Sequence, residues 1–192
     1  MRHTKYYVSV GVLGVALAAG SGILAESKPQ GSAVEIRRTQ EQVVLYTIHR
    51  GPFDKLGSTI GKLMGMAGPK GLYPKGSISL MYLNDFEAVP SQHWLTEIRI
   101  PVPEEGLRHA GTFGEFTDVK KLPSIEVAVA SKPQGLASPE SIYRQLHSYM
   151  FENGYMPTEG PCEVFLTNAQ ASDYSNMKSE IMIPSRKVVA AK

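Results

Sequence analysis

The acidic residue with the most distinctive surroundings in this sequence is Glu163, in the apolar stretch CEVF at 162–165. Side chains alternate between the two faces of a β-strand, so Glu163 and Phe165 share one face while Cys162 and Val164 share the other. If the first face lines a pocket, the carboxylate is partly desolvated and requires a cation or a proton. An aromatic cation would satisfy both the charge and nearby rings. The alternative is that Glu163 faces water, as most glutamates do.

The other residues able to carry out chemistry form no recognisable set. Cys162 is the only cysteine, which excludes an internal disulfide and favours a small buried side chain on a strand. The five histidines lack metal-ligand spacing, and no fingerprint of a serine hydrolase, P-loop or dinucleotide enzyme is present. We therefore expect no metal and no cofactor.

The composition indicates a globular protein, and its charge balance gives no reason to expect a strongly charged partner. The chain has 192 residues, of which 42% are hydrophobic and 20% charged, enough to bury a core. The formal net charge is +2, and both surplus charges, Arg2 and Lys5, lie near the N-terminus. The rest of the chain is balanced, which gives no reason to expect a nucleic-acid partner.

The N-terminal residues are typical of an export signal. A basic MRHTKYY precedes the apolar run Val8–Ala19, and the polar ESKPQGS follows Ala25. Cleavage after Ala25 or after Ser21 would release an exported protein into the periplasm or cell envelope. An uncleaved membrane anchor over residues 8–25 is the alternative. The expected organisation is a signal peptide or anchor at 1–25, a polar tether at 26–41, and a globular domain at 42–187.

An internal repeat organises this domain. TEIRIPV at 96–102 recurs as SEIMIPS at 179–185. The same offset, to within one residue, relates several other pairs: Asn84 with Asn168, 71–74 with 154–157, 62–63 with 145–146, and 43–48 with 126–131.

Each half of the repeat reads as β-α-β-β. The pattern predicts an α+β fold of two duplicated halves, 42–102 and 125–187, related by a pseudo-two-fold, with antiparallel sheets and one long helix each. Ser138 is the expected N-cap of the second helix, and Pro101 and Pro184 are expected to end the last strands. Expected strands are 42–49, 77–84, 93–102, 124–131, 162–168 and 178–185; expected helix stripes are Leu56, Ile60, Leu63, Met64 and Ile142, Leu146, Tyr149, Met150.

The order of these motifs resembles the GyrI-like small-molecule-binding domain, which is also the effector-binding domain of AraC-type and MerR-type multidrug regulators and is related to the SOUL fold. The resemblance covers about residues 42–187. The chain departs from the family at 83–86, where Leu-Asn-Asp-Phe replaces Tyr-Asp-Asp-Pro. The motifs that carry it are RGPF at 50–53, ISLMYLND at 78–85, TEIRIPV at 96–102, ENGY at 152–155, GPCEVF at 160–165 and SEIMIP at 179–184.

The resemblance implies a ligand cavity between the halves, lined by aromatic residues around one buried carboxylate, for which Glu163 is the matching residue. Ordinary core packing is the alternative for each wall residue. In a SOUL-like interpretation His49 and His93 are haem ligands, although lone histidines are more often ordinary side chains. Glu97 and Glu180 match each other across the repeat and are interpreted as structural. The expected wall residues are Phe165, Met81, Tyr46, Phe53, Tyr82, Trp94 and Tyr149, with Met81 opposite Phe165.

The function we expect is an exported or membrane-tethered domain that binds lipophilic or cationic small molecules. One alternative is a small hydrolase of strained electrophiles with Glu163 as general base. Another is a protein-interaction module of the envelope. Residues 26–42 are too short for a helix-turn-helix, which disfavours a DNA-binding regulator, and export disfavours a gyrase inhibitor. The oligomeric state stays open.

Overall fold

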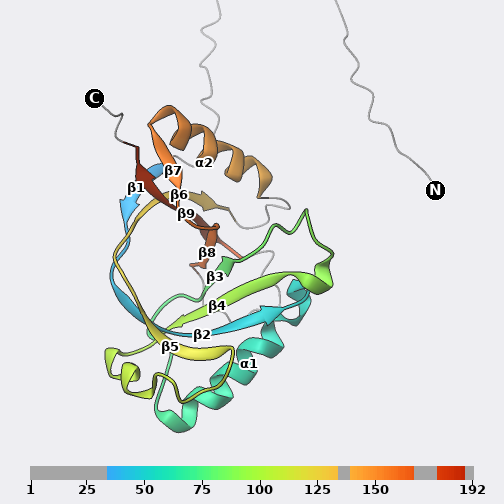
Figure 1. Cartoon of the computed structure of the whole chain (residues 1–192), viewed down its shortest axis with the longest axis vertical. Coiled ribbons are helices and arrows are strands. Elements are labelled where there is room, and N and C mark those ends of the chain that lie inside the picture. The colour runs from blue at the N-terminus through green and yellow to red at the C-terminus, as the bar shows by residue number, and fades with distance from the viewer. Residues whose placement is uncertain (1–33, 134–138, 167–176, 189–192) are drawn as a thin grey trace, which may run out of the picture. The chain divides into compact units, whose positions relative to one another are not determined.

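The computed structural model describes residues 34–133, 139–166 and 177–188, all within one compact unit, Gly31–Lys192. The fold is α+β, as predicted (Figure 1). The elements in chain order are β1 (Glu35–Arg38), β2 (Gln42–Arg50), α1 (Leu56–Ala67), β3 (Ser79–Tyr82), β4 (Leu95–Pro101), β5 (Thr117–Leu122), β6 (Glu126–Lys132), α2 (Glu140–Glu152), β7 (Tyr155–Pro157), β8 (Cys162–Phe165) and β9 (Ser179–Lys187).

The strands form one large antiparallel sheet, ordered β1-β6-β9-β8-β3-β4-β2-β5, with β7 paired to β9. The centre of the sheet is the pair β3–β8, where Leu80 lies opposite Glu163. Outward from this pair the chain supplies β4, β2 and β5 on one side and β9, β6 and β1 on the other. The predicted halves therefore contribute to one continuous sheet, whereas their origin by duplication stays a prediction.

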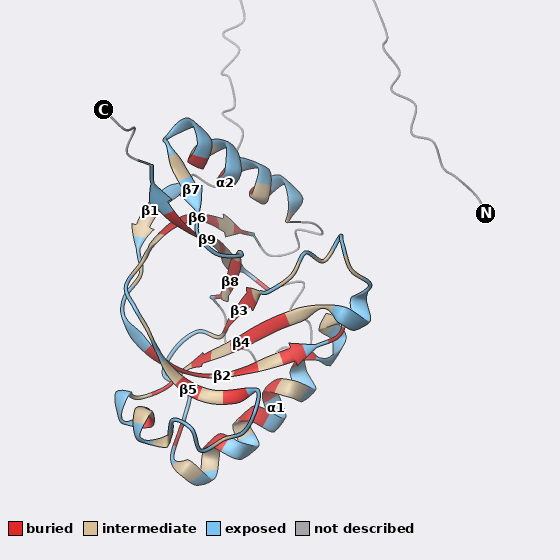
Figure 2. Ribbon diagram, in the orientation of Figure 1, coloured by how far each residue is buried: buried red, intermediate tan, exposed pale blue. Residues whose placement is uncertain are grey.

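Both helices pack against the same face of the sheet. In α1, Leu56, Ile60 and Leu63 are buried against β2, β3 and β4, as their spacing predicts. The buried residues of α2 contact the β6–β9 part of the sheet, and Figure 2 shows burial concentrated on the strands. The second cluster comprises Ala128, Ala130, Ile142, Leu146, Met150, Ile181 and Ile183.

The apolar stripe of α2 differs from the prediction at one position. Tyr143 packs against this second cluster, while Tyr149 lies beside a surface hollow with Arg144. The face of α2 that packs on the sheet therefore includes Tyr143 in place of the predicted Tyr149. It ends before Gly154, whose φ of 69° is the left-handed conformation that glycine adopts without strain.

The opposite face of the sheet is also buried. Val44 and Val127 are at most 2% exposed, although neither faces a helix. Two connections between the ends of the sheet, 39–41 and 123–125, are hydrogen-bonded to each other. The Thr39 amide donates to the Ile125 carbonyl, and the Ile125 amide donates to the Thr39 hydroxyl.

Three strands lie where the sequence predicted none. β1 falls inside the expected tether at 26–41, β5 lies between the expected halves, and β7 has three residues. β1 and β5 are the outermost strands of the sheet. Their sequences, EIRR and TDVKKL, are polar, so no apolar pattern marks them as strands, and they form because they pair with a neighbouring strand. The expected tether is therefore partly a sheet strand.

The prediction that Pro184 ends its strand is wrong. β9 continues to Lys187 because its residues beyond Pro184 pair with β7 instead of β6, and Ser185 lies opposite Pro157. Pro101, by contrast, is the last residue of β4.

Two predictions fall outside the described residues, namely the signal or anchor at 1–25 and the N-cap at Ser138. Within the described ranges, neither helix combines the length and apolar character needed to cross a bilayer.

Candidate functional site

Glu163 lies at the centre of the sheet, on the face that carries both helices. It pairs with Leu80 of β3 and Ile181 of β9, so its side chain shares their face. The predicted alternation along β8 is confirmed, since Phe165 of this face belongs to the core beneath α1. Glu163 is 6% exposed, and therefore does not face water.

Three donors from three strands hold the Glu163 carboxylate. Its Oε1 accepts hydrogen bonds from Lys132 Nζ at 2.6 Å and Ser179 Oγ at 2.5 Å. Its Oε2 accepts a hydrogen bond from the Tyr82 hydroxyl at 2.6 Å. Lys132 ends β6, Ser179 begins β9 and Tyr82 ends β3, so the strand ends around β8 converge on one group.

Lys132 gives the carboxylate a cation from within the protein. Both side chains of the pair are less than a tenth exposed, and a buried charge is tolerated only with a close, hydrogen-bonded counter-charge. The prediction from the sequence assigned the counter-charge of Glu163 to a ligand and did not include Lys132. A signal was present, because alternation along β6 places Lys132 on the same face as Ala128 and Ala130.

Two tyrosines near Glu163 are kept neutral. Burial raises the pKa of Tyr82 well above 10.0, and the Glu163 charge raises it further. Burial also raises the pKa of Tyr143, again with a contribution from Glu163. Both phenols therefore remain protonated across the physiological pH range, and Tyr82 acts as a donor to the carboxylate.

An aromatic cluster adjoins Tyr82. It consists of Phe53, Tyr82, Phe86 and Trp94, with neighbouring ring centroids 4.9 to 6.0 Å apart in tilted or edge-to-face contacts. The Trp94 indole donates to the carbonyls of Phe86 and Val89, which fixes its ring. Phe53, Tyr82 and Trp94 are among the predicted wall residues, whereas Phe86, which replaces the proline of the family pattern, was not predicted.

Three predicted wall residues lie elsewhere. Met81 is on the opposite face, in register with Glu97 and Cys162, because it neighbours Tyr82 along one strand. The expectation that Met81 faces Phe165 is therefore wrong. Tyr46 is also on the opposite face, with its ring 4.2 Å from Lys120 Nζ, and Tyr149 lies on α2 at the surface hollow.

Glu97 and Glu180 have the structural role expected of them. Glu97 forms ion pairs with Arg99 and with Lys120, and Glu180 forms one with Arg37. Burial pushes the pKa of Glu97 upward, but the hydrogen bonds and charges of Lys120 and Arg99 outweigh it, so the pKa is lowered.

His49, one of the two histidines considered for a haem, is committed to the protein, whereas His93 is exposed. Both ring nitrogens of His49 have partners, the Thr59 hydroxyl at 2.9 Å and the Pro52 carbonyl at 3.2 Å. Burial raises the pKa of the Cys162 thiol to about 11, so it has little thiolate character. Within the described part of the chain, no group of three or more metal-binding side chains occurs.

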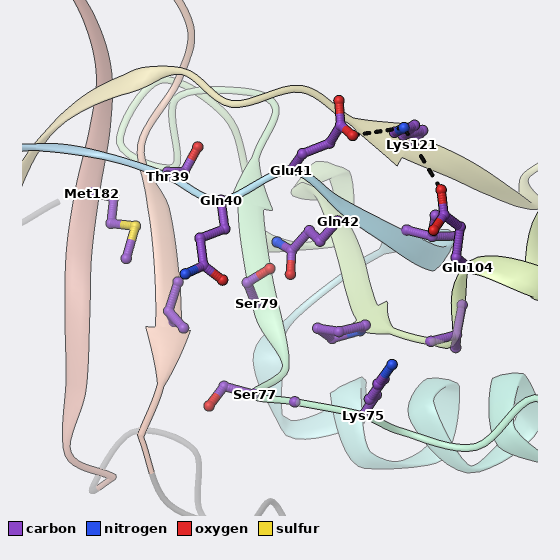
Figure 3. A pocket seen from close by; sticks show the side chains of 15 residues that line it. Thr39, Gln40, Glu41, Gln42, Lys75, Ser77, Ser79, Glu104, Lys121 and Met182 are labelled. Carbon is purple, nitrogen blue, oxygen red and sulfur yellow. Dashed lines mark ion pairs between the residues drawn. The ribbon is translucent and has the colours of Figure 1, made fainter.

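Three hollows are lined entirely by described residues. The largest, about 560 Å³, lies beside the segment that leads from β1 to β2 (Figure 3). A second lies beside Tyr149, and a third beside Tyr82, Asp85 and Arg99. None of these three includes Glu163, which is covered by its own partners.

Comparison with known proteins identifies the fold. No protein-family model matches the sequence, and no curated protein matches it. Among solved structures, the C-terminal domain of EcmrR aligns with 82% of this chain and 99% of its own, at 18% identity and a TM-score of 0.64. An uncharacterized conserved protein from Listeria innocua aligns with 81% of this chain and 93% of its own, at 11% identity and a TM-score of 0.61.

A Listeria innocua protein described as a hydrolase has the same coverage, 81% of this chain and 93% of its own, at 11% identity and a TM-score of 0.56. At these identities the likeness shows the fold. The predicted resemblance to a GyrI-like effector-binding domain is therefore confirmed at the level of the fold, and function has to be argued from the site.

Proposed function

We propose that this protein is a small-molecule-binding domain whose ligand site lies on the helix-covered face of the sheet, around Glu163. The observation that carries the proposal is the buried Glu163 carboxylate, held by Lys132, Ser179 and Tyr82 beside a cluster of four aromatic rings. Buried polar groups next to aromatic surface provide orientation and affinity for lipophilic ligands. The fold shared with an effector-binding domain supports the same proposal.

The Lys132 ammonium determines which ligand charge the site accepts. A cationic ligand that pairs with Glu163 has to displace Lys132, and Lys132 then needs water or another partner. A neutral lipophilic ligand leaves the pair in place. We therefore propose that the protein prefers neutral lipophilic molecules, and that cations bind strongly only when Lys132 is released or removed.

Thermal denaturation with a matched pair of dyes tests this proposal. Crystal violet is a lipophilic aromatic cation, and its leuco form is an uncharged analogue at mildly alkaline pH. Ligands that bind the folded protein raise Tm by mass action. The parent should be stabilised by the leuco form at least as well as by the cation. Lys132→Met should gain about tenfold in preference for the cation, equivalent to about 1.4 kcal/mol.

Two further variants make the result specific. Glu163→Gln combined with Lys132→Met should lose the gained preference, because no carboxylate remains. Glu180→Gln removes an ion-paired carboxylate on the opposite face and should leave both dyes unaffected. A parent protein whose Tm neither dye changes, or equal dye preference in all variants, contradicts the proposal.

A hydrolase is the second candidate. The specific observation is the Tyr82 hydroxyl at 2.6 Å from Glu163, a pair able to orient a nucleophilic water and stabilise a leaving oxygen. A carboxylate offers about four acceptor positions, and donors from the described residues take three of them. In this second candidate function a water takes the fourth. Turnover of an aryl epoxide that disappears in Glu163→Gln and falls in Tyr82→Phe would favour this function, which a Listeria innocua neighbour is described as having.

Export and duplication complete the proposal. Residues 1–25 are proposed to direct the domain out of the cytoplasm, either cleaved or as an anchor, and N-terminal sequencing of the protein from membrane and soluble fractions tests this.

The two halves are proposed to descend from one β-α-β-β unit. The strand order, which runs outward through corresponding elements from β3 and β8, supports that origin.

A further inference from the structure

The largest described hollow lies on the face of the sheet opposite Glu163. Its floor includes Ser79, Val164 and Met182, and Val164 is the direct neighbour of Glu163 along β8, so their side chains point to opposite faces. The segment 39–42, which leads from β1 into β2, forms one lip (Figure 3). This hollow is consequently separate from the site proposed above.

Among the described residues, several exposed polar side chains of this hollow have no protein partner. Within the described part of the chain, no hydrogen bond or ion pair occupies the side chains of Gln40, Gln42, Ser77 or Lys75. In Figure 3 the Gln40 and Gln42 side chains lie on either side of Ser79, and Lys75 lies on the segment that also carries Ser77. A volume of about 560 Å³ falls within the range of small-molecule pockets.

Acidic side chains and the Lys75 ammonium group lie at separate places on the rim of this hollow. On one side Lys121 lies between two acids, 2.6 Å from Glu41 and 3.8 Å from Glu104, which leaves one negative charge in excess. Lys75 lies on the other side, and no ion pair joins it to either acid. An empty site with a separated cation and anion complements a zwitterion. Between the two rims lie the apolar side chains of Val164 and Met182.

We propose that this hollow is a second ligand site, for a short zwitterionic peptide with a medium-sized apolar side chain. Its carboxylate pairs with Lys75, its ammonium group lies beside Glu104 and Glu41, and its amide groups meet the carboxamides of Gln40 and Gln42. The apolar side chain packs on the floor formed by Val164 and Met182. A dipeptide also has a peptide group for the carboxamides of Gln40 and Gln42, which a free amino acid lacks.

Titration of the ¹⁵N-labelled protein with the dipeptide Ala-Leu tests the proposal. Ala-Leu should shift the backbone amide resonances of Gln40, Gln42, Ser77 and Ser79. N-acetyl-Ala-Leu and Ala-Leu amide each lack one charge and should bind about fivefold more weakly, as expected for one exposed charge contact. In Lys75→Met, Ala-Leu should bind as weakly as its amide does to the parent.

Controls separate this site from the one around Glu163. Lys70→Met removes a neighbouring lysine that does not line the hollow and should leave Ala-Leu binding unchanged. Ser77→Trp fills the space from an exposed position and should abolish binding. No shift at these four amides with millimolar Ala-Leu, or equal affinity for all three peptides, would overturn the proposal. Its failure leaves the proposed function intact, because the dye experiments report on the other face.

Discussion

At the scale of single residues, the central feature is a buried ion pair in which both charges belong to the protein. Glu163 and Lys132 come from β8 and β6, which are separated by β9, and meet over Ser179. A pair of this kind adds little net stability compared with apolar residues of the same size, but leaving one partner alone is costly. In the proposed site, selectivity for ligand charge would depend on Glu163 and Lys132, of which the sequence singled out only Glu163.

Lys132→Met should destabilise the protein strongly, by about 3–5 kcal/mol, because Glu163 is left buried without a counter-charge. Adding Glu163→Gln removes that charge and should recover most of the loss. Urea unfolding of the parent, both single variants and the double variant measures the coupling. Additive effects of the two substitutions would contradict a direct buried pair.

The Cys162 thiol should react slowly with alkylating reagents in the folded protein. Its side chain is 8% exposed, and burial raises its pKa to about 11, so both thiolate fraction and access are low. Iodoacetamide should therefore react slowly with the native protein and rapidly in urea, which mass spectrometry can follow. Equal rates in the two conditions would show that β8 is not packed as described.

At the scale of elements, the sheet is most tightly constrained where the turn before β8 meets β3. A Cβ added at Gly160 would lie 2.4 Å from the Tyr82 carbonyl oxygen, and the Tyr82 amide donates to the Pro161 carbonyl. Because Tyr82 also binds Glu163, this turn fixes one wall of the candidate site.

Gly160→Ala should destabilise the protein by about 1–3 kcal/mol, since backbone has to move to accept the methyl group. The matched control is Gly65→Ala on the exposed side of the last turn of α1, where a Cβ would meet nothing within 4 Å. That change should stabilise by about 0.5–1 kcal/mol through helix propensity. Thermal or urea unfolding of both variants measures the contrast, and the same sign for both would contradict the described turn.

The elements with strong apolar periodicity were predictable from the sequence, and the others were not. β2, β4 and β6 and both helices lie where the pattern indicates, because their buried stripes are encoded locally. β1, β5 and β7 are short or polar, and they exist because a neighbouring strand offers hydrogen-bonding groups. In the candidate site, Tyr82, Phe53 and Trp94 form the aromatic cluster beside Glu163, whereas Met81, which was expected to face Phe165, lies on the opposite face. That these residues line a ligand cavity stays a prediction.

At the scale of the whole molecule, acid should weaken the fold partly through Glu97. Its pKa in the folded protein lies below the ordinary 4.5 because of Lys120 and Arg99. A carboxylate with a lowered folded-state pKa adds stability that is complete above its unfolded-state pKa and is lost as pH falls through the folded value.

The free energy of unfolding should therefore fall below about pH 4.5, and Glu97→Gln should flatten this decline while lowering stability at neutral pH. Urea unfolding at neutral pH and at about pH 3 measures the difference. A parent and variant with parallel pH profiles would show that the Glu97 ion pairs add nothing pH-dependent.

The measurement that most directly tests the central claim is hydrogen–deuterium exchange of the whole chain with and without the leuco form of crystal violet. The claim is that a lipophilic ligand binds on the helix-covered face around Glu163. It predicts slower exchange in β3, β8 and the start of β9 when the dye is bound. Protection confined to the segments 39–42 and 75–77, or no protection anywhere, would contradict it.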